Sequence, residues 1–220
     1  MIRYDILASG SSGNCTVIEN EIMIDAGAPY KALRPYIKTL RLALLTHGHA
    51  DHFNASTIAA LARERPSLRF VCGPWLYDKL LGCGVFKFQV DRLWINESAA
   101  YSAGCSKCTD GCTVKMVPAV HDAPNCGYKI KLPDGQRIFY LTDTSSLSGI
   151  AAKNYDLYML EQNYEDEEIQ RRIDAKISAG EYAYEIHARE NHLSAAKAKE
   201  WLDKNAGPNS LVVPMHVHRD

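Results

Sequence analysis

Short apolar runs alternate with turn residues through the first third of the chain. These runs predict strands at residues 4–8, 15–19 and 21–25, and the segment 9–14, rich in serine and glycine, predicts a turn. Asn20 and its neighbours predict a tight hairpin between the second and third strands. The pattern is therefore a meander of short strands.

Helical and strand-like patterns then alternate to the end of the chain. We expect helices at 30–38, 56–64, 74–81, 165–176 and 194–204, and strands that include 42–46, 69–72 and 156–160. Ser56 is the expected N-cap of the second helix, and that helix is expected to stop near Pro66. Residues 133–135 predict a hairpin turn. Strand meanders with helices between them suit an α/β (α+β) chain, with two β-sheets packed face to face and helices outside, an αββα sandwich.

Length and charge narrow the class of protein. The 220 residues fit one domain spanning 1–220 with a substantial core. No apolar run reaches the roughly 18 residues of a membrane span, and residues 1–5 lack a signal-peptide layout, so we expect a cytoplasmic protein without a membrane partner. The net charge of −1 argues against extended binding to duplex nucleic acid. It leaves open a nuclease that grips only an end or a short strand.

The seven cysteines are odd in number and scattered, which suits reduced thiols. Cys105, Cys108 and Cys112 form the one dense group. They could be part of a structural zinc knuckle completed by Cys126 or Cys83, or they could lie in a turn where their thiols are incidental. The second interpretation is favoured, because no fourth ligand is evident.

The most informative stretch follows the predicted strand at 42–46, where His47, His49, Asp51 and His52 fall within six residues. Imidazole nitrogens suit zinc, iron or manganese as ligands. An added carboxylate makes the site chemically harder, so that it favours oxygen-rich substrates and water. In an extended or turn conformation, His47 and His49 can point the same way. Asp51 and His52 can then face a second ion, so the stretch predicts half of a paired-metal centre.

Three more candidate ligands stand at the ends of apolar, strand-like runs: His121, Asp143 and His216. A lone histidine at a strand end is more often structural, but here three candidates follow in order. Together with the His-x-His-x-Asp-His stretch, they resemble the ligand pattern of the metallo-β-lactamase superfamily. The resemblance covers nearly the whole chain and implies the αββα fold of that superfamily.

The resemblance also implies a role for each ligand. One ion would be held by His47, His49 and His121, the other by Asp51, His52 and His216, with Asp143 as the bridge between them. The cofactors would be two divalent ions, with zinc expected and manganese or iron also tolerated. They would share a hydroxide that attacks the substrate.

Two further segments are candidates for supporting the loop that carries His47, His49, Asp51 and His52. Asp25 is expected to orient this loop through hydrogen bonds, with a simple turn-forming role as the alternative. The turn at residues 11–14 could cradle an anion or support the loop, and the sequence does not decide between these.

Finer motifs separate the branches of the superfamily. His49 stands where redox members carry glutamate, and classical lactamases often lack the aspartate or carry cysteine at the bridge. Residues 7–14, 141–144 and 191–194 instead resemble the YycJ-type group, a relative of ribonuclease Z and of cyclic phosphodiesterases. In that group a glutamate pairs with a histidine that opens a late helix.

The matching residues here are Glu161 and His192, which the resemblance implies for proton delivery. A structural role stays open for each residue. Glu161 could be a partly buried acid paired with a neighbouring base, and His192 could be a helix-start residue whose ring caps or packs. Asn191 stands where relatives carry glycine, which leaves the geometry of this loop open.

The leading hypothesis is a dinuclear metal-dependent phosphodiesterase with Asp51, Glu161 and His192 as candidate catalytic residues. Its substrate partner would be a nucleic-acid end or a small cyclic or linear nucleotide, and a homodimer is expected by analogy alone. One alternative is hydrolysis of a carboxyl ester, thioester or lactam, and another is non-catalytic metal binding or sensing. His187 and His218 have no assigned role.

Overall fold

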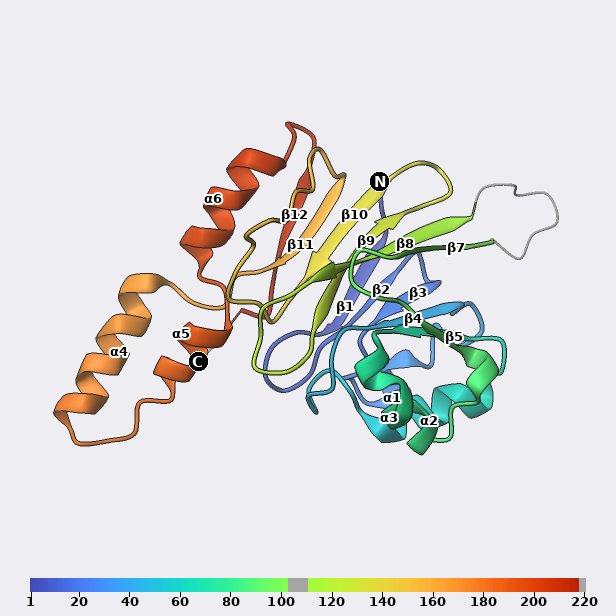
Figure 1. The fold of residues 1–220 in the computed structure, drawn as a ribbon, viewed down its shortest axis with the longest axis horizontal. Coiled ribbons are helices and arrows are strands. Elements are labelled where there is room, and N and C mark those ends of the chain that lie inside the picture. Colours follow the sequence, from blue (N-terminus) through green and yellow to red (C-terminus); the bar gives the residue numbers. More distant parts are fainter. Residues whose placement is uncertain (103–110, 218–220) are drawn as a thin grey trace. The chain divides into compact units, whose positions relative to one another are not determined.

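The computed structural model describes residues 1–102 and 111–217. Their contacts divide the chain into two compact units: unit 1 is residues 1–99 with 123–126, and unit 2 is residues 100–122 with 127–220. Cys105, Cys108 and His218 lie outside the described residues. Each unit contains one six-stranded mixed sheet with helices beside it (Figure 1).

The strands of unit 1 follow one another in space as they do in the chain. They are β1 (Tyr4–Ala8), β2 (Cys15–Ile18), β3 (Ile22–Ile24), β4 (Leu42–Leu45), β5 (Arg69–Cys72) and β6 (Val90–Arg92). The first three are antiparallel, whereas β3 to β6 run parallel. The predicted hairpin after β2 is confirmed, and Glu19 and Asn20 adopt the left-handed φ of 51° and 58° that a tight hairpin requires.

The helical segments of unit 1 are α1 (Tyr30–Leu33), α2 (Ala55–Glu64), η1 (Pro74–Leu76), α3 (Tyr77–Gly82) and η2 (Lys87–Gln89). The prediction of a helix over 30–38 is wrong beyond Leu33, because Pro35 has no amide N–H with which to continue the helical hydrogen bonds. The prediction of Ser56 as N-cap is also wrong. Asn54 caps α2, and its side chain accepts a hydrogen bond from the Thr57 amide at 3.1 Å.

Unit 2 is built on a sheet with the spatial order β12–β11–β10–β9–β8–β7. Its strands are β7 (Ser98–Tyr101), β8 (Cys112–Pro118), β9 (Cys126–Lys131), β10 (Arg137–Leu141), β11 (Leu157–Glu161) and β12 (Leu211–Met215). β9 and β10 form an antiparallel hairpin around the predicted turn at 133–135, whereas β10, β11 and β12 run parallel. The carboxyl ends of these three strands therefore lie at one edge.

Three helices accompany this sheet: α4 (Asp166–Ser178), α5 (Glu185–Asn191) and α6 (Ala195–Asn205). α6 begins at its predicted place, where the Ser194 side chain accepts from the Lys197 amide. Trp201 of α6 stacks on Phe139 of β10, with 5.0 Å between ring centroids. α4 and α5 contact one another around a small separate core (Figure 1). The sequence pattern did not predict α5, which is short and mostly polar.

Within the described ranges, none of the helices combines the length and apolar character needed to cross a bilayer.

Gly27 lies where the segment after β3 passes the segment after β4. A Cβ atom at this position would lie 1.7 Å from the Asp51 carbonyl oxygen and 2.6 Å from the Asn14 amide nitrogen. Both of these atoms belong to backbone, which cannot move aside as a flexible side chain can. Only glycine fits here.

We therefore expect Gly27→Ala to lower the free energy of unfolding by at least about 1–3 kcal/mol, the usual cost of overpacking. The control is Gly82→Ala at the end of α3, where an added Cβ meets nothing within 4 Å. Urea unfolding of the two variants checks the prediction. Equal stability of both variants would contradict it.

Candidate active site

In unit 1, three histidines gather in the segment 46–53, which we call the metal loop. The loop follows the fully buried strand β4, so its start is fixed by the sheet. His47 Nε2 lies 3.1 Å from His49 Nδ1, and the ring centroids of His47 and His52 are 4.2 Å apart. Asp51 lies beside them, with Oδ2 3.4 Å from His52 Nε2. The four candidates from this stretch thus form one group.

Asp25, directly after β3, supports the loop from behind and is completely buried. Its Oδ1 accepts a hydrogen bond from the Thr46 amide at 2.8 Å, and its Oδ2 lies 2.7 Å from His52 Nδ1. An ionised carboxylate only accepts hydrogen bonds, so His52 Nδ1 carries the proton and its Nε2 carries the lone pair. Burial raises the pKa of Asp25, and its contacts with His52 and Thr46 oppose that rise. These contacts are those expected of a residue that orients the loop.

The side chain of Asn14 fastens the turn after β1 to the same loop. Its Nδ2 donates to Asp51 Oδ2 at 3.1 Å and lies 2.8 Å from His52 Nε2, while its Oδ1 accepts from the Gly10 amide at 2.9 Å. Its backbone amide donates to the Asp51 carbonyl. These contacts favour loop support over anion binding as the role of the turn.

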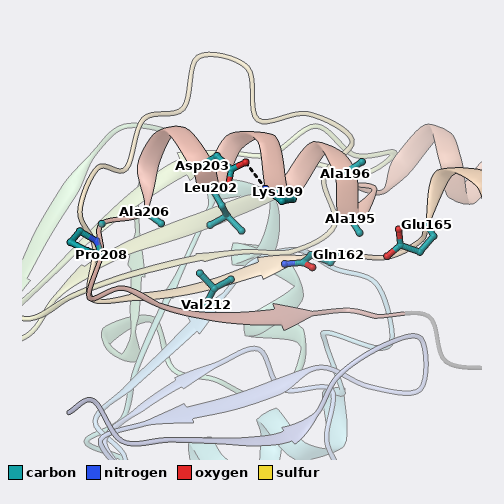
Figure 2. Close-up of a pocket in the computed structure, with 11 residues that line it drawn as sticks. Gln162, Glu165, Ala195, Ala196, Lys199, Leu202, Asp203, Ala206, Pro208 and Val212 are labelled. Carbon is teal, nitrogen blue, oxygen red and sulfur yellow. Dashed lines mark hydrogen bonds and ion pairs between the residues drawn. The ribbon is translucent and has the colours of Figure 1, made fainter.

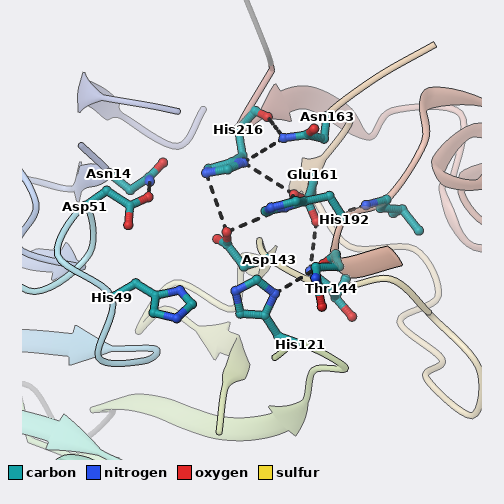
Figure 3. A network of polar contacts seen from close by, with 12 residues as sticks. Asn14, His49, Asp51, His121, Asp143, Thr144, Glu161, Asn163, His192 and His216 are labelled. Atoms are coloured by element: carbon teal, nitrogen blue, oxygen red, sulfur yellow. Dashed lines mark hydrogen bonds and ion pairs between the residues drawn. The ribbon is translucent and has the colours of Figure 1, made fainter. Parts of the chain in front are cut away.

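In unit 2, Asp143, Glu161, His192 and His216 gather at the edge where β10, β11 and β12 end (Figure 3). One ligand atom from each lies within 4.8 Å of the others. Asp143 Oδ1 is 3.5 Å from His216 Nε2 and 3.7 Å from His192 Nδ1. Asp143 follows β10 by two residues and His216 follows β12 directly, as their apolar runs predicted.

Glu161 is the last residue of β11, and its carboxylate is fully buried. Oε2 accepts from the Thr144 amide at 2.8 Å and from the Leu193 amide at 3.3 Å, while Oε1 lies 2.6 Å from His192 Nδ1. The carboxylate is thus surrounded by hydrogen-bond donors, which offset the cost of burying it.

The prediction that His192 opens a helix is wrong. His192 is the C-cap of α5 and has extended backbone, because Ser194 takes the N-cap position of α6.

His121 lies three residues beyond β8, and its Nδ1 is 3.2 Å from the Asn191 carbonyl oxygen. Its ring centroid is 5.4 Å from that of His192. Burial lowers the pKa of His121, which favours the neutral imidazole that metals bind, although Asp143 opposes the shift. The contact with position 191 uses the backbone, so asparagine in place of glycine still supplies it.

The sequence did not reveal two residues that brace the unit 2 group. Asn163 Nδ2 lies 2.9 Å from His216 Nδ1 and donates to the His216 carbonyl at 2.9 Å. Thr144 Oγ1 accepts from the Val120 amide at 3.0 Å, which fixes the segment leading to His121. Both residues lie just after strands, and their strand-end position was the only signal that could have found them.

Three residues of these groups adopt left-handed backbone, each directly or closely after a strand. Asp25, Asp143 and His216 have φ of 57°, 55° and 51°. This conformation costs an ordinary residue about 1–2 kcal/mol. Such strained positions cluster at functional sites, where the surrounding contacts hold them.

The donor atoms fit divalent metal ions. Two nitrogens that each lie about 2.0–2.1 Å from a tetrahedral zinc ion are roughly 3.4 Å apart, close to the 3.1 Å between His47 Nε2 and His49 Nδ1. Both units offer imidazole nitrogens together with carboxylate oxygens.

His187 differs from these histidines, because it is exposed on α5 and lies 3.5 Å from Asp122. Its role stays unassigned.

A hollow of about 780 Å³ lies between α6 and β12 (Figure 2). Its lining includes Leu202, Val212 and the ion pair of Lys199 with Asp203 at 2.6 Å. None of the described residues that line it is a candidate ligand. The candidate ligands therefore lie outside this hollow, at or near strand ends.

Comparisons with known proteins identify the family to which the chain belongs. The profile of the beta-lactamase superfamily domain matches residues 20–217, so the chain belongs to this superfamily. It is a metal-dependent hydrolase of the metallo-β-lactamase type and has the fold predicted from the sequence.

Among individual proteins, the chain is similar to exodeoxyribonuclease WalJ of Streptococcus pneumoniae. The two are 26% identical over 224 residues, which cover 93% of this chain and 77% of the relative.

Solved structures show the same fold at low sequence identity. YhfI from Bacillus subtilis aligns with a TM-score of 0.71 at 14% identity, covering 98% of this chain and 86% of its own. The short form of human tRNase Z aligns with a TM-score of 0.67 at 14% identity, covering 100% and 93%. A diphosphatase of the PhnP family aligns with a TM-score of 0.64 at 16% identity, covering 99% and 87%.

The contact between Asp25 and His52 gives a testable prediction. We expect Asp25→Asn to weaken metal affinity about 10–100-fold, because the amide no longer holds the His52 ring as a carboxylate does. Asp134→Asn, in the exposed β9–β10 turn, is the matched control. Zinc affinity is measured by competition with a chromophoric chelator. Equal affinities in the two variants would show that Asp25 does not support the ligand.

Proposed function

We propose that this hydrolase cleaves phosphodiester bonds in a nucleic-acid end or a small nucleotide. The observation that carries the proposal is the pairing of His192 with the buried Glu161 carboxylate at 2.6 Å. A histidine held in this way can deliver a proton to a departing oxygen. An alkoxide that leaves phosphorus needs that proton.

The contact with Glu161 supports proton donation from His192 Nε2. Glu161 faces His192 Nδ1, so the Nδ1 proton stays on the carboxylate side and the transferable proton is on Nε2. The His192 side chain is 18% exposed, whereas that of Glu161 is inaccessible. A substrate can therefore reach the imidazole and not the carboxylate, which supports His192 as the proposed general acid and Glu161 as its positioning partner.

Seven side chains are proposed to hold two divalent ions, most consistent with zinc: His47, His49, Asp51, His52, His121, Asp143 and His216. Asp143 is the proposed bridge, and Asp51 is proposed both as a ligand and as a catalytic residue. Family membership and the donor groups within each unit support this assignment. When bound, such ions activate water and stabilise charge on phosphoryl oxygens.

The similarity to an exodeoxyribonuclease supports a nucleic-acid substrate. The alternatives are hydrolysis of a carboxyl ester, thioester or lactam, and metal sensing without catalysis. A thioester hydrolase does not require a proton-donating pair of the Glu161–His192 type, because a thiolate leaves without a proton. The contact of Glu161 with His192 therefore favours the phosphodiesterase over a thioester hydrolase, and the similarity to an exodeoxyribonuclease favours it over ester and lactam hydrolysis.

The superfamily profile spans both units, which supports a single domain over 1–220. The homodimer stays a prediction by analogy.

The dependence of the rate on the leaving group provides the sharpest test of His192 as a general acid. With thymidylyl-thymidine, whose leaving alkoxide needs a proton, His192→Ala should lower kcat about 10²–10⁴-fold. With bis-p-nitrophenyl phosphate the loss should be smaller, because p-nitrophenolate leaves without one. Glu161→Gln should act through His192, so the double variant should be no slower than the slower single one.

His187→Ala is the control, since His187 is an exposed histidine on the neighbouring helix α5. It should leave the hydrolysis of both substrates unchanged. Equal losses of His192→Ala on both substrates, with full metal content, would exclude a general acid. Turnover of a thioester or nitrocefin that is faster than phosphodiester turnover would favour the acyl alternative.

The ligand assignment predicts metal content independently of activity. The purified, zinc-loaded chain should hold two equivalents of zinc by elemental analysis, and His216→Ala should hold fewer. His187→Ala should keep both equivalents. A single equivalent in the unaltered chain would contradict the paired centre.

A further inference from the structure

We propose that unit 1 carries a binding track for single-stranded nucleic acid beside the metal loop, formed by Lys79, Arg92 and Trp94. We call these three residues the edge track. The inference rests on the proposed function and specifies the form of the substrate: an unpaired strand with phosphates and bases on either side of the scissile bond.

The topology places the edge track next to the metal loop. β4, β5 and β6 run parallel, so all three end at the same edge of the sheet. The register aligns Leu45 with Cys72, and Cys72 with Arg92. Neighbouring strands are about 4.8 Å apart, so the backbone of Arg92 lies roughly 10 Å along this edge from the start of the metal loop. Trp94 follows two residues later.

Lys79 of α3 lies against the metal loop itself. Its ammonium group donates to the Gly48 carbonyl and stands 4.4 Å from the centroid of the Phe53 ring. The side chain is nevertheless exposed. It therefore places a positive charge in solvent, at the residue between His47 and His49.

Arg92 places a second positive charge at the same edge. Its guanidinium carbon lies 4.5 Å from the centroid of the Tyr77 ring, at the start of α3. Within the described part of the chain, no carboxylate forms an ion pair with Lys79 or Arg92, whereas neighbouring Asp91 is paired with Arg69. Asp78 and Glu97 are exposed acids nearby, and neither of them forms an ion pair with Lys79 or Arg92. The edge is thus suited to phosphates.

Trp94 supplies a surface for a base. Its side chain is 67% exposed, and its backbone amide donates to Glu97 Oε2 at 2.8 Å, which fixes the turn after β6. Every base has a π-face, so stacking on an aromatic ring strengthens binding without sequence preference. Cations beside an exposed indole favour a nucleic-acid strand over an apolar protein partner.

The chain offers a matched control at the other edge of the same sheet. Phe86 and Phe88 are also exposed and stack at 5.4 Å between centroids. They precede β6, whereas Trp94 follows it. They are therefore similar in exposure and chemistry, but lie away from the edge that bears the metal loop.

The first experiment measures binding of fluorescein-labelled oligothymidylate to the full zinc-loaded chain by anisotropy. Trp94→Ala should weaken binding about 5- to 100-fold, whereas Phe88→Ala should not change it. Arg92→Ala and Lys79→Ala should each reduce the salt slope of log affinity by about 0.7. Equal binding by the Trp94 and Phe88 variants, or unchanged salt slopes, would overturn the edge track.

The second experiment separates this inference from the proposed function. Hydrolysis of oligothymidylate and of bis-p-nitrophenyl phosphate is compared, because the latter has no bases or flanking phosphates. Trp94→Ala should lower kcat/KM more for the oligonucleotide than for the small diester, whereas proportional losses on both would contradict the track. If the unaltered chain hydrolyses neither, the proposed function fails, and the binding measurement still decides the track.

Discussion

A buried carboxylate that accepts the Nδ1 proton of a histidine occurs in each unit, and the candidate active site depends on these two contacts. Asp25 holds His52 at 2.7 Å, and Glu161 holds His192 at 2.6 Å. Each carboxylate also accepts the amide of a threonine that follows a parallel strand, Thr46 or Thr144. In both units the sheet therefore determines where the carboxylate lies, and the carboxylate determines that Nε2 is the ring nitrogen that points away from it.

The same contact has a different consequence in each unit. His52 is completely buried and is placed among other imidazoles, which suits a ligand. His192 is partly exposed beside Asp143, which suits a group that meets the substrate. Burying a carboxylate is costly unless hydrogen-bond donors surround it, so loss of the histidine would remove one of the donors that offset this cost. The left-handed backbone at Asp25 and Asp143 adds to the cost that the surrounding contacts must offset.

Much of the fold could be predicted from the sequence because the strands are short, apolar and bounded by turn residues. The order of the candidate ligands could also be read, since each follows an apolar run. The supporting contacts could not. Asn14 reaches Asp51 across 37 residues, and Asn163 reaches His216 across 53, so these pairs depend on strand register that no local pattern records. His192 was misplaced because α5 is too short and polar to give a clear helical period.

The most direct test of the account is the position of the imidazole protons in the zinc-loaded protein, measured by long-range ¹H–¹⁵N NMR with labelled histidines. In the neutral imidazole of His192 the proton should lie on Nδ1, with a downfield resonance that is absent in Glu161→Ala. His52 should likewise carry its proton on Nδ1. A proton on Nε2 of either ring would contradict the claim that the buried carboxylates set the orientation of the site.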